Sequence, residues 1–219
     1  MSYNIAIDGP AGAGKSTIAR AVAKRMGILY VDTGAMYRAM ALFMLREGVD
    51  PGDESRIDDK CREADITIRY EGDEQVVYLN GENVNPYLRT EEVGNMASAT
   101  SARPKVREKM VELQHTLAAQ SDCVMDGRDI GTCVLPDAQV KIYLTASSAV
   151  RARRRFDELE KKGQPCDLET IRKDIEERDY RDMHREHSPL CRAKDAILVD
   201  SSDMTIEEVI AHILKLCER

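Results

Sequence analysis

The 219-residue sequence has no long apolar run, no paired-cysteine motif and no excess of basic residues. A membrane span needs about 18 apolar residues, and the chain runs directly into an expected first strand, so we expect neither membrane helix nor signal peptide. The six cysteines form no C-x-x-C pair, which favours reduced thiols and a cytoplasmic protein. The net charge of −7 argues against nucleic-acid binding.

The chain shows no internal repeat, and its length suits one α/β domain with insertions. Five short apolar segments separated by helical patterns predict a doubly wound, five-stranded parallel sheet. We expect strands at 4–8, 28–31, 123–125, 140–144 and 196–199. We expect helices at 17–26, 34–47 (with Thr33 as N-cap), 55–64, 91–100, 104–119, 147–162, 168–185 and 205–217.

One region departs from this alternation. Residues 66–70 and 75–79 alternate apolar and polar side chains around a Gly-Asp turn, which predicts a small antiparallel hairpin or meander. We therefore predict a single domain over 1–219. Its core would comprise 1–56, 104–146 and 189–219, with an insertion at 57–103 and a helical lid region at 147–188.

A phosphate-binding loop follows the first expected strand. The residues Gly9-Pro10-Ala11-Gly12-Ala13-Gly14-Lys15-Ser16-Thr17 match G-x-x-x-x-G-K-[ST]. The glycines let backbone N–H groups point into one hollow, and the following helix directs its positive end there. Lys15 would reach the β- and γ-phosphates, and Ser16 would ligate Mg²⁺. The motif predicts a bound nucleoside triphosphate but does not identify the phosphate acceptor.

Charged residues also follow the other expected strands. Asp32 and Thr33 leave the second strand and precede Tyr37 and Arg38, whereas Asp126, Arg128 and Asp129 leave the third. Ligands of such sheets lie outside the carboxyl ends of the strands, where an Asp suits a magnesium-bound water and an Arg suits a phosphate. The alternative is ordinary Asp-Gly turn chemistry.

The expected helix at 168–185 changes character along its length. Its apolar stripe of Leu168, Ile171 and Ile175 continues at the same spacing as Arg178, Asp182 and Arg185, with Arg181 adjoining. This end could be a solvated ladder of charges that includes Glu177 and Asp179. It could instead face a phosphate-filled cleft and form a basic, lid-like hairpin with Arg151, Arg153, Arg154 and Arg155.

No obvious pair of histidine and carboxylate suggests a general base. A phosphate acceptor, with a second pKa of about 6, is already a nucleophile at neutral pH. This favours a nucleoside monophosphate acceptor over an alcohol, although Asp32 or Asp126 could serve as a base.

Five segments together resemble the bacterial-type cytidylate kinases over essentially the whole chain. They are IDGPAGAGKST (7–17), DTGAMYR (32–38), RPKVR (103–107), DGRDIGT (126–132) and ERDYRD (177–182). The resemblance implies a nucleoside monophosphate kinase fold, with the 57–103 insertion in the monophosphate-binding part. It also implies transfer of the ATP γ-phosphate to CMP or dCMP with Mg²⁺. Only small-molecule partners are implied, and we expect a monomer.

The resemblance also implies roles for individual residues. Tyr37, Arg38 and Arg128 would meet the acceptor phosphate, with Asp32 and Thr33 nearby, and Arg178 and Asp182 would meet the ribose. The cytosine would face Ser98, Arg107, Asp129 and Arg185. Lys15, Arg128, Arg178 and Arg181 would act on the transferring phosphate. Cytosine offers an N4 amine that a carboxylate can accept, and uracil would mismatch there.

Two residues depart from the family pattern, and two other functions stay open. Thr33 replaces a common serine, and Tyr180 replaces a common acidic residue. One alternative is a kinase for UMP, AMP or a small alcohol. The other is a non-catalytic nucleotide-dependent switch, although a guanine-reading N-K-x-D segment is absent.

Overall fold

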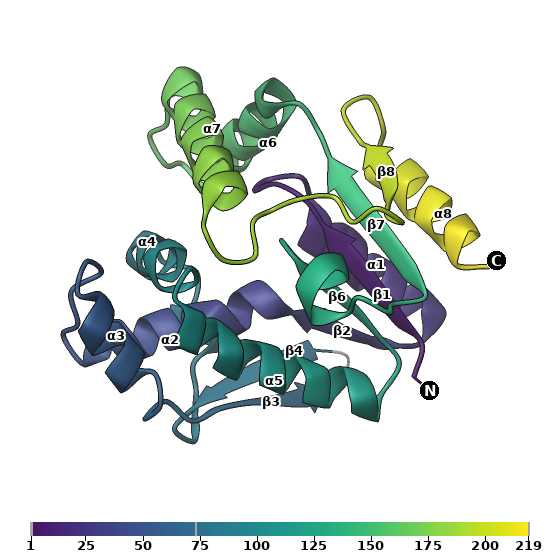
Figure 1. The fold of residues 1–219 in the computed structure, drawn as a ribbon. Coiled ribbons are helices and arrows are strands. Elements are labelled where there is room, and N and C mark those ends of the chain that lie inside the picture. Colours follow the sequence, from purple (N-terminus) through teal and green to yellow (C-terminus); the bar gives the residue numbers. More distant parts are fainter. Residues whose placement is uncertain (1, 73, 219) are drawn as a thin grey trace. The chain divides into compact units, whose positions relative to one another are not determined.

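The computed structural model describes residues 2–72 and 74–218, and its fold is drawn in Figure 1. A five-stranded parallel sheet has the strand order β2-β6-β1-β7-β8, and a three-stranded sheet has the order β3-β4-β5. The predicted fold class is therefore confirmed. By its internal contacts the chain forms two compact units, one of Ser2 with Ile28–Cys123 and one of Tyr3–Gly27 with Val124–Arg219.

In the second unit, β1 (Asn4–Asp8) is central and almost fully buried. It pairs in parallel with β7 (Val140–Thr145), which pairs in parallel with β8 (Ile197–Asp200). On its other side β1 neighbours β6 (Cys123–Gly127). Because the strand order reverses next to β1, the segments that leave the carboxyl ends of β1 and β6 emerge at the position where such sheets bind ligands.

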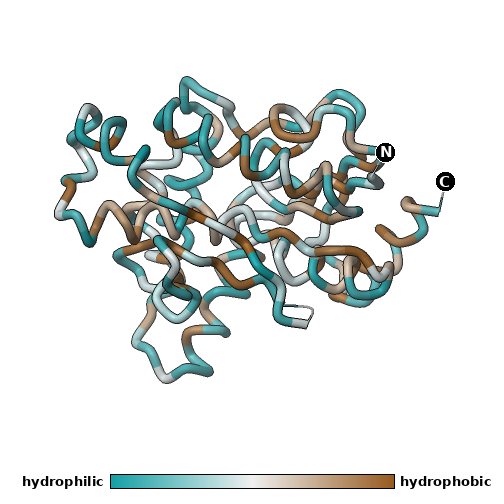
Figure 2. Tube along the Cα trace, turned by 90° about the horizontal axis from the view of Figure 1, so that it is seen from below, coloured by the Kyte–Doolittle hydropathy of each residue, from teal (hydrophilic) through white to brown (hydrophobic). Residues whose placement is uncertain are grey.

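Among the described residues this unit also contains four α-helices. α1 (Lys15–Met26) lies beside α8 (Ile206–Cys217), and α6 (Ser148–Lys161) pairs with α7 (Leu168–His184), as Figure 1 shows. Helices α1 and α8 bury mainly apolar side chains, whereas α6 and α7 each bury one charged residue, Arg151 and Asp179. In α8 the buried side chains Val209, Ile210 and Ile213 form one stripe, and the chain near the C-terminus alternates between brown and teal in Figure 2. Reciprocal hydrogen bonds between Thr205 and Glu208 cap its first turn.

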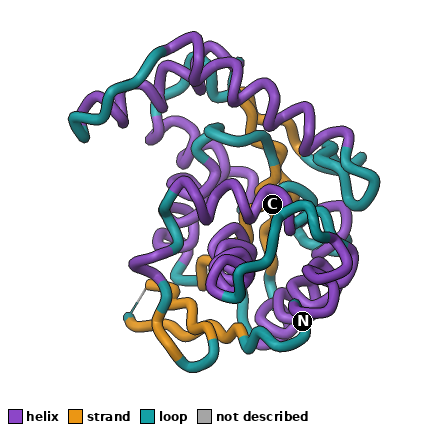
Figure 3. Tube along the Cα trace, turned by 90° about the vertical axis from the view of Figure 1, so that its left-hand side faces the viewer, coloured by secondary structure: helices purple, strands orange, loops and turns teal. Residues whose placement is uncertain are grey.

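In the first unit, the long helix α2 (Thr33–Arg46) is the element on which several other elements of the unit pack. Its methionines Met36, Met40 and Met44 are fully buried at helical spacing, and α2 packs against α4, α5 and the small sheet. In Figure 3 the strands of the small antiparallel sheet are drawn as orange tube segments. The remaining elements are β2 (Leu29–Asp32), α3 (Glu54–Lys60), β3 (Ile66–Glu71), β4 (Glu74–Leu79), β5 (Glu82–Asn83), the short helix η1 (Asn85–Tyr87), α4 (Glu91–Thr100) and α5 (Pro104–Gln120).

Several local predictions were wrong, each for a physical reason. Thr33 is not the N-cap of α2; Asp32 is, because its carboxylate accepts a hydrogen bond from the Ala35 N–H at 2.8 Å. Helix α1 begins at Lys15, two residues earlier than predicted, since Gly14 already turns the chain. The one-turn π-helix η2 (Ile130–Val134) was not predicted, because so short an element has no apolar period.

Candidate active site

The phosphate loop, Gly9–Gly14, connects β1 to α1 in the second unit. A side chain at Gly9 is impossible, because its Cβ would lie 1.9 Å from the Leu144 carbonyl oxygen of β7. Gly14, at φ 85°, takes a left-handed conformation at the start of α1 and contributes no capping side chain. The first N–H groups of α1 are therefore available for an anion, as the motif predicted.

Lys15 lies at the base of this loop and is only 6% exposed. Its Nζ donates a hydrogen bond to the Pro10 carbonyl at 2.8 Å. Burial, together with the charge of Arg128, lowers the pKa of this ammonium to about 7, although Asp126 and Asp8 act in the opposite direction. An anionic phosphate beside Lys15 would offset the burial and favour the charged form.

Two side chains that could supply oxygen ligands to a metal ion, Ser16 and Asp126, contact each other beside the loop. The Ser16 hydroxyl donates a hydrogen bond to Asp126 Oδ2 at 2.9 Å. Oxygen donors of this kind suit Mg²⁺, which binds proteins through one or two side chains and otherwise through phosphates and water. Elsewhere, no group of three or more His, Cys, Asp or Glu side chains in the described residues could hold a metal.

The DGRD segment, Asp126–Asp129, leaves the carboxyl end of β6. Arg128 Nε donates to Asp182 Oδ2 of α7 at 2.8 Å, and Arg185 approaches Asp129 Oδ1 at 3.5 Å. Asp129 is buried, whereas Arg128, Asp182 and Arg185 are half-buried. The structure thus brings together four of the predicted substrate-binding residues in two ion pairs of opposite polarity.

The predicted charged face of α7 was correct in part. Asp182 contacts the DGRD segment, and so does Arg185, which directly follows the helix, whereas Arg178 and Arg181 are exposed. The inward residue of this turn is Asp179, which the sequence analysis named only in its alternative of a solvated ladder of charges. It is buried because it forms an ion pair with Arg151 of α6 at 2.6 Å.

Arg151 is the arginine near the phosphate loop whose position the sequence predicted least well. It was grouped with a basic lid surface, but it is 5% exposed and its NH1 donates to the Ala11 carbonyl of the phosphate loop at 2.9 Å. Its Nε donates to the Ala146 carbonyl at 2.8 Å. One guanidinium therefore connects the phosphate loop, the end of β7 and α7. Nothing in its local sequence distinguishes it from its neighbouring arginines.

The first unit holds a second group of predicted site residues around the start of α2. We call Asp32, Thr33, Tyr37, Arg38 and Arg107 the Arg38 cluster. Asp32 holds the Arg38 guanidinium at 3.3 Å, and the buried Nε of Arg38 has no hydrogen-bond partner in the described part of the chain. Arg107 is buried over the Tyr37 ring, with its guanidinium carbon 5.8 Å from the ring centroid. Thr33 is buried at the same helix end, and Ser98 is half-buried on α4.

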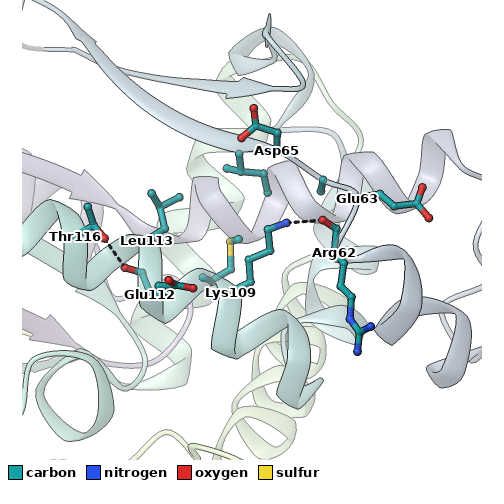
Figure 4. A pocket seen from close by; sticks show the side chains of 10 residues that line it. Arg62, Glu63, Asp65, Lys109, Glu112, Leu113 and Thr116 are labelled. Carbon is teal, nitrogen blue, oxygen red and sulfur yellow. Dashed lines mark hydrogen bonds between the residues drawn. The ribbon is translucent and has the colours of Figure 1, made fainter.

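A cavity of about 460 Å³ lies elsewhere in the first unit, between the segment 62–65, the first residue of β3 and α5. Figure 4 shows its lining, in which Lys109 reaches over to donate a hydrogen bond to the Arg62 carbonyl at 3.1 Å. Acidic and basic side chains alternate around it, and none of the predicted site residues lines it. The cavity is therefore not the candidate active site.

Comparison with known proteins identifies the family. The cytidylate kinase family model matches residues 5–219. The chain belongs to the cytidylate kinase family. The cytidylate kinase of Lactobacillus gasseri is 51% identical over 215 residues, covering 98% of this chain and 94% of that protein. The cytidylate kinase of Listeria innocua is 50% identical over 216 residues, covering 98% and 96%. The resemblance seen in five sequence segments is thus confirmed.

Solved structures support the fold. A shikimate kinase from Bacteroides thetaiotaomicron matches with a TM-score of 0.50 at 14% identity, covering 99% of both chains. An uncharacterized protein from Eubacterium ventriosum matches with a TM-score of 0.53, also at 14% identity. At such identity the matches show the fold alone. Within the described ranges, no helix is long and apolar enough to cross a membrane.

Proposed function

We propose that this member of the cytidylate kinase family transfers the γ-phosphate of ATP to CMP or dCMP, giving ADP and CDP or dCDP. The observation that carries the proposal lies in the second unit. There, a phosphate loop with a buried lysine emerges beside a segment whose arginine and aspartate are already paired with α7 and its following residue. A donor site and an acceptor-reading segment therefore emerge from neighbouring strands.

The triphosphate is held by the backbone of the phosphate loop and the first N–H groups of α1. Lys15 exchanges its hydrogen bond to Pro10 for one to a phosphate oxygen, which provides an electrostatic gain that grows as charge develops in transfer. Ser16 would hold Mg²⁺ directly and Asp126 would hold it through water, and the ion when bound neutralises charge on the β- and γ-phosphates.

The acceptor phosphate has a suitable receptor in the Arg38 cluster. Arg38 is held only loosely by Asp32, and its buried Nε has no protein partner among the described residues, so it retains donor capacity for an anion. The family resemblance assigns the acceptor phosphate to Tyr37 and Arg128 as well, and it assigns Thr33 to substrate binding. Because a phosphate acceptor is already anionic at neutral pH, the site needs no general base.

In this proposal the cytosine is recognised by both hydrogen-bond acceptors and hydrogen-bond donors. Asp129 accepts from the N4 amine, and Arg107 and Arg185 donate to N3 and O2, with Ser98 also facing the base. Asp182 and Arg178 bind the ribose. Arg178 and Arg181 are solvent-exposed on α7, and in this proposal their guanidinium groups act on the transferring phosphate. The predicted division into core, insertion and lid, the monomeric state and the cytoplasmic location remain predictions.

An acceptor panel tests the function. We would measure ADP release from ATP and Mg²⁺ with CMP, dCMP, UMP, AMP and shikimate as acceptors. We expect CMP and dCMP to be turned over far faster than the others. Equal turnover of UMP and CMP would contradict the reading of cytosine. Slow ATP hydrolysis that no acceptor stimulates would support a nucleotide-dependent switch instead.

A further inference from the structure

A buried carboxylate connects the phosphate loop to the segment that follows β6. Asp8 is the last residue of β1, immediately before the loop, and is 4% exposed. Its Oδ1 accepts a hydrogen bond from the Ile130 N–H at 2.8 Å, and its Oδ2 accepts one from the Gly131 N–H at 2.7 Å. These are the first two N–H groups of η2, which a helix cannot satisfy internally.

This contact fixes the far end of the DGRD segment. The near end belongs to β6, and the far end, Asp129, directly precedes Ile130. Asp129 itself has an irregular backbone, at φ −147° and ψ 25°. The placement of Arg128 and Asp129 therefore depends on how the chain is held on both sides of them, and Asp8 holds one side.

The space around the Gly131 Cα is also closely packed. A Cβ at position 131 would lie 3.4 Å from Asp8 Oδ2 and 3.2 Å from Lys141 Cδ. Lys141 is itself buried and forms an ion pair with Asp195 at 2.7 Å. The peptide is therefore clamped between a carboxylate and a lysine stem, and it has little room to shift.

The arrangement carries a stability cost. Burial raises the pKa of the Asp8 carboxyl to about 6, although the N–H groups of Gly131 and Ile130 act in the opposite direction. Near pH 8 the folded protein keeps Asp8 ionised in a site that disfavours its charge.

We propose that Asp8 is a positioning residue for the acceptor, acting through the backbone of Ile130 and Gly131 to set the place of Arg128 and Asp129. The proposal rests on the proposed function, in which Arg128 and Asp129 contact the monophosphate. It assigns to the residue before the phosphate loop an effect on acceptor binding rather than on ATP binding.

The test compares Asp8→Asn and Gly131→Ala with wild type. Asp8→Asn removes the charge and directs an N–H group at one of the two amides, whereas Gly131→Ala crowds the same contact without any change in charge. We expect each variant to raise the KM for CMP about tenfold, the effect typical of residues that orient a ligand group. The KM for ATP should not rise, since removing a negative charge near the loop does not weaken triphosphate binding.

Two controls separate positioning from folding. Asp53→Asn alters an exposed capping aspartate, which accepts from the Arg56 N–H at 3.0 Å in the first unit, and should change neither KM. The double variant Asp8→Asn/Gly131→Ala should raise the KM for CMP by less than the product of the single effects, because both act on one contact. Melting temperatures at pH 8 should not fall in Asp8→Asn.

The outcomes are distinguishable. An unchanged KM for CMP in both single variants would overturn the proposal, as would an equal rise in both KM values with a lower melting temperature. If Asp8→Asn fails to fold, Gly131→Ala alone decides. The wild-type acceptor panel decides the proposed function separately, and the acceptor that wild type uses is the one whose KM is then compared.

Discussion

The phosphate loop after β1 and the DGRD segment after β6 occupy equivalent positions in one sheet, but different forces organise them. The loop is shaped mainly by its own glycines, of which Gly12 and Gly14 have positive φ angles, although Leu144 excludes a side chain at Gly9 and Arg151 donates to the Ala11 carbonyl. The DGRD segment is shaped by partners far away in the chain: Asp8 holds its end, and Asp182 and Arg185 pair with its side chains. One is a local motif and the other a tertiary assembly.

The difference shows how each could bind its ligand. Backbone N–H groups in the loop carry partial positive charge that no side chain neutralises, so they suit a permanently anionic triphosphate. In the DGRD segment Arg128 and Asp129 are each already paired with a residue of opposite charge. An acceptor there must compete with existing ion pairs, which favours a ligand that matches both signs over any simple anion.

The largest effect should come from the loop. We expect Lys15→Met to lower kcat about 10³-fold, since it removes a charge directed at the transferring phosphate. The fold should be intact, because methionine fills the same buried volume without an unpaired ammonium. Steady-state kinetics and thermal unfolding would check this, and a near-normal kcat would refute the role of Lys15.

The next effect tests the tertiary support of the DGRD segment through pH. The raised pKa of Asp8 means that its stabilising contribution is present below about pH 4 and is lost as pH rises through about 6. The unfolding free energy of Asp8→Asn relative to wild type should therefore improve between pH 4 and pH 8, by up to about 3 kcal/mol. Urea denaturation at the two pH values measures this difference. No change with pH would indicate that Asp8 is not the titrating group.

A smaller effect should come from the segment itself. Asp129→Asn should raise the KM for CMP about 50-fold and narrow the preference for CMP over UMP, since a base contact of this kind provides about 1–3 kcal/mol of discrimination. The KM for ATP should stay within a factor of about 2. Equal changes for CMP and ATP would place Asp129 in the donor site and remove the distinction between the two segments.

The smallest effect should come from the first unit. Arg107→Met should raise the KM for CMP about tenfold with the KM for ATP nearly unchanged, as expected for the loss of one charged hydrogen bond. Initial rates with each substrate varied in turn would check it. A comparable rise for both substrates would indicate a folding defect, because Arg107 is buried beside Tyr37.

Much of the fold could be predicted from the sequence, because strands and long helices are signalled by apolar periods. The predicted strands and helices are all present, with boundaries that coincide or shift by up to four residues. The exceptions are local. Thr33 and Asp32 are both good N-caps, and only the hydrogen bond to the Ala35 N–H distinguishes them. The short elements β5 and η2 are too brief to leave a period.

The candidate site was predictable to a lesser extent. A stripe at spacings of three and four identifies a helix face only within about one residue, since adjacent residues differ by 100° around the axis. That margin separates exposed Arg178 from buried Asp179 on α7. Arg151 was indistinguishable from the arginines beside it until the structure placed its guanidinium on the Ala11 carbonyl and Asp179.

By itself, the sequence determined the phosphate loop, the family and the identity of the groups that can meet a nucleotide. The loop conformation follows from glycines at fixed spacing, which need no distant partner. Only the tertiary structure decided that Asp8 supports the segment after β6, and that Asp179 is buried. Both depend on side chains meeting residues 28 to 123 positions away, such as Arg151 for Asp179 and Gly131 for Asp8. Such meetings arise from packing, and no local pattern records them.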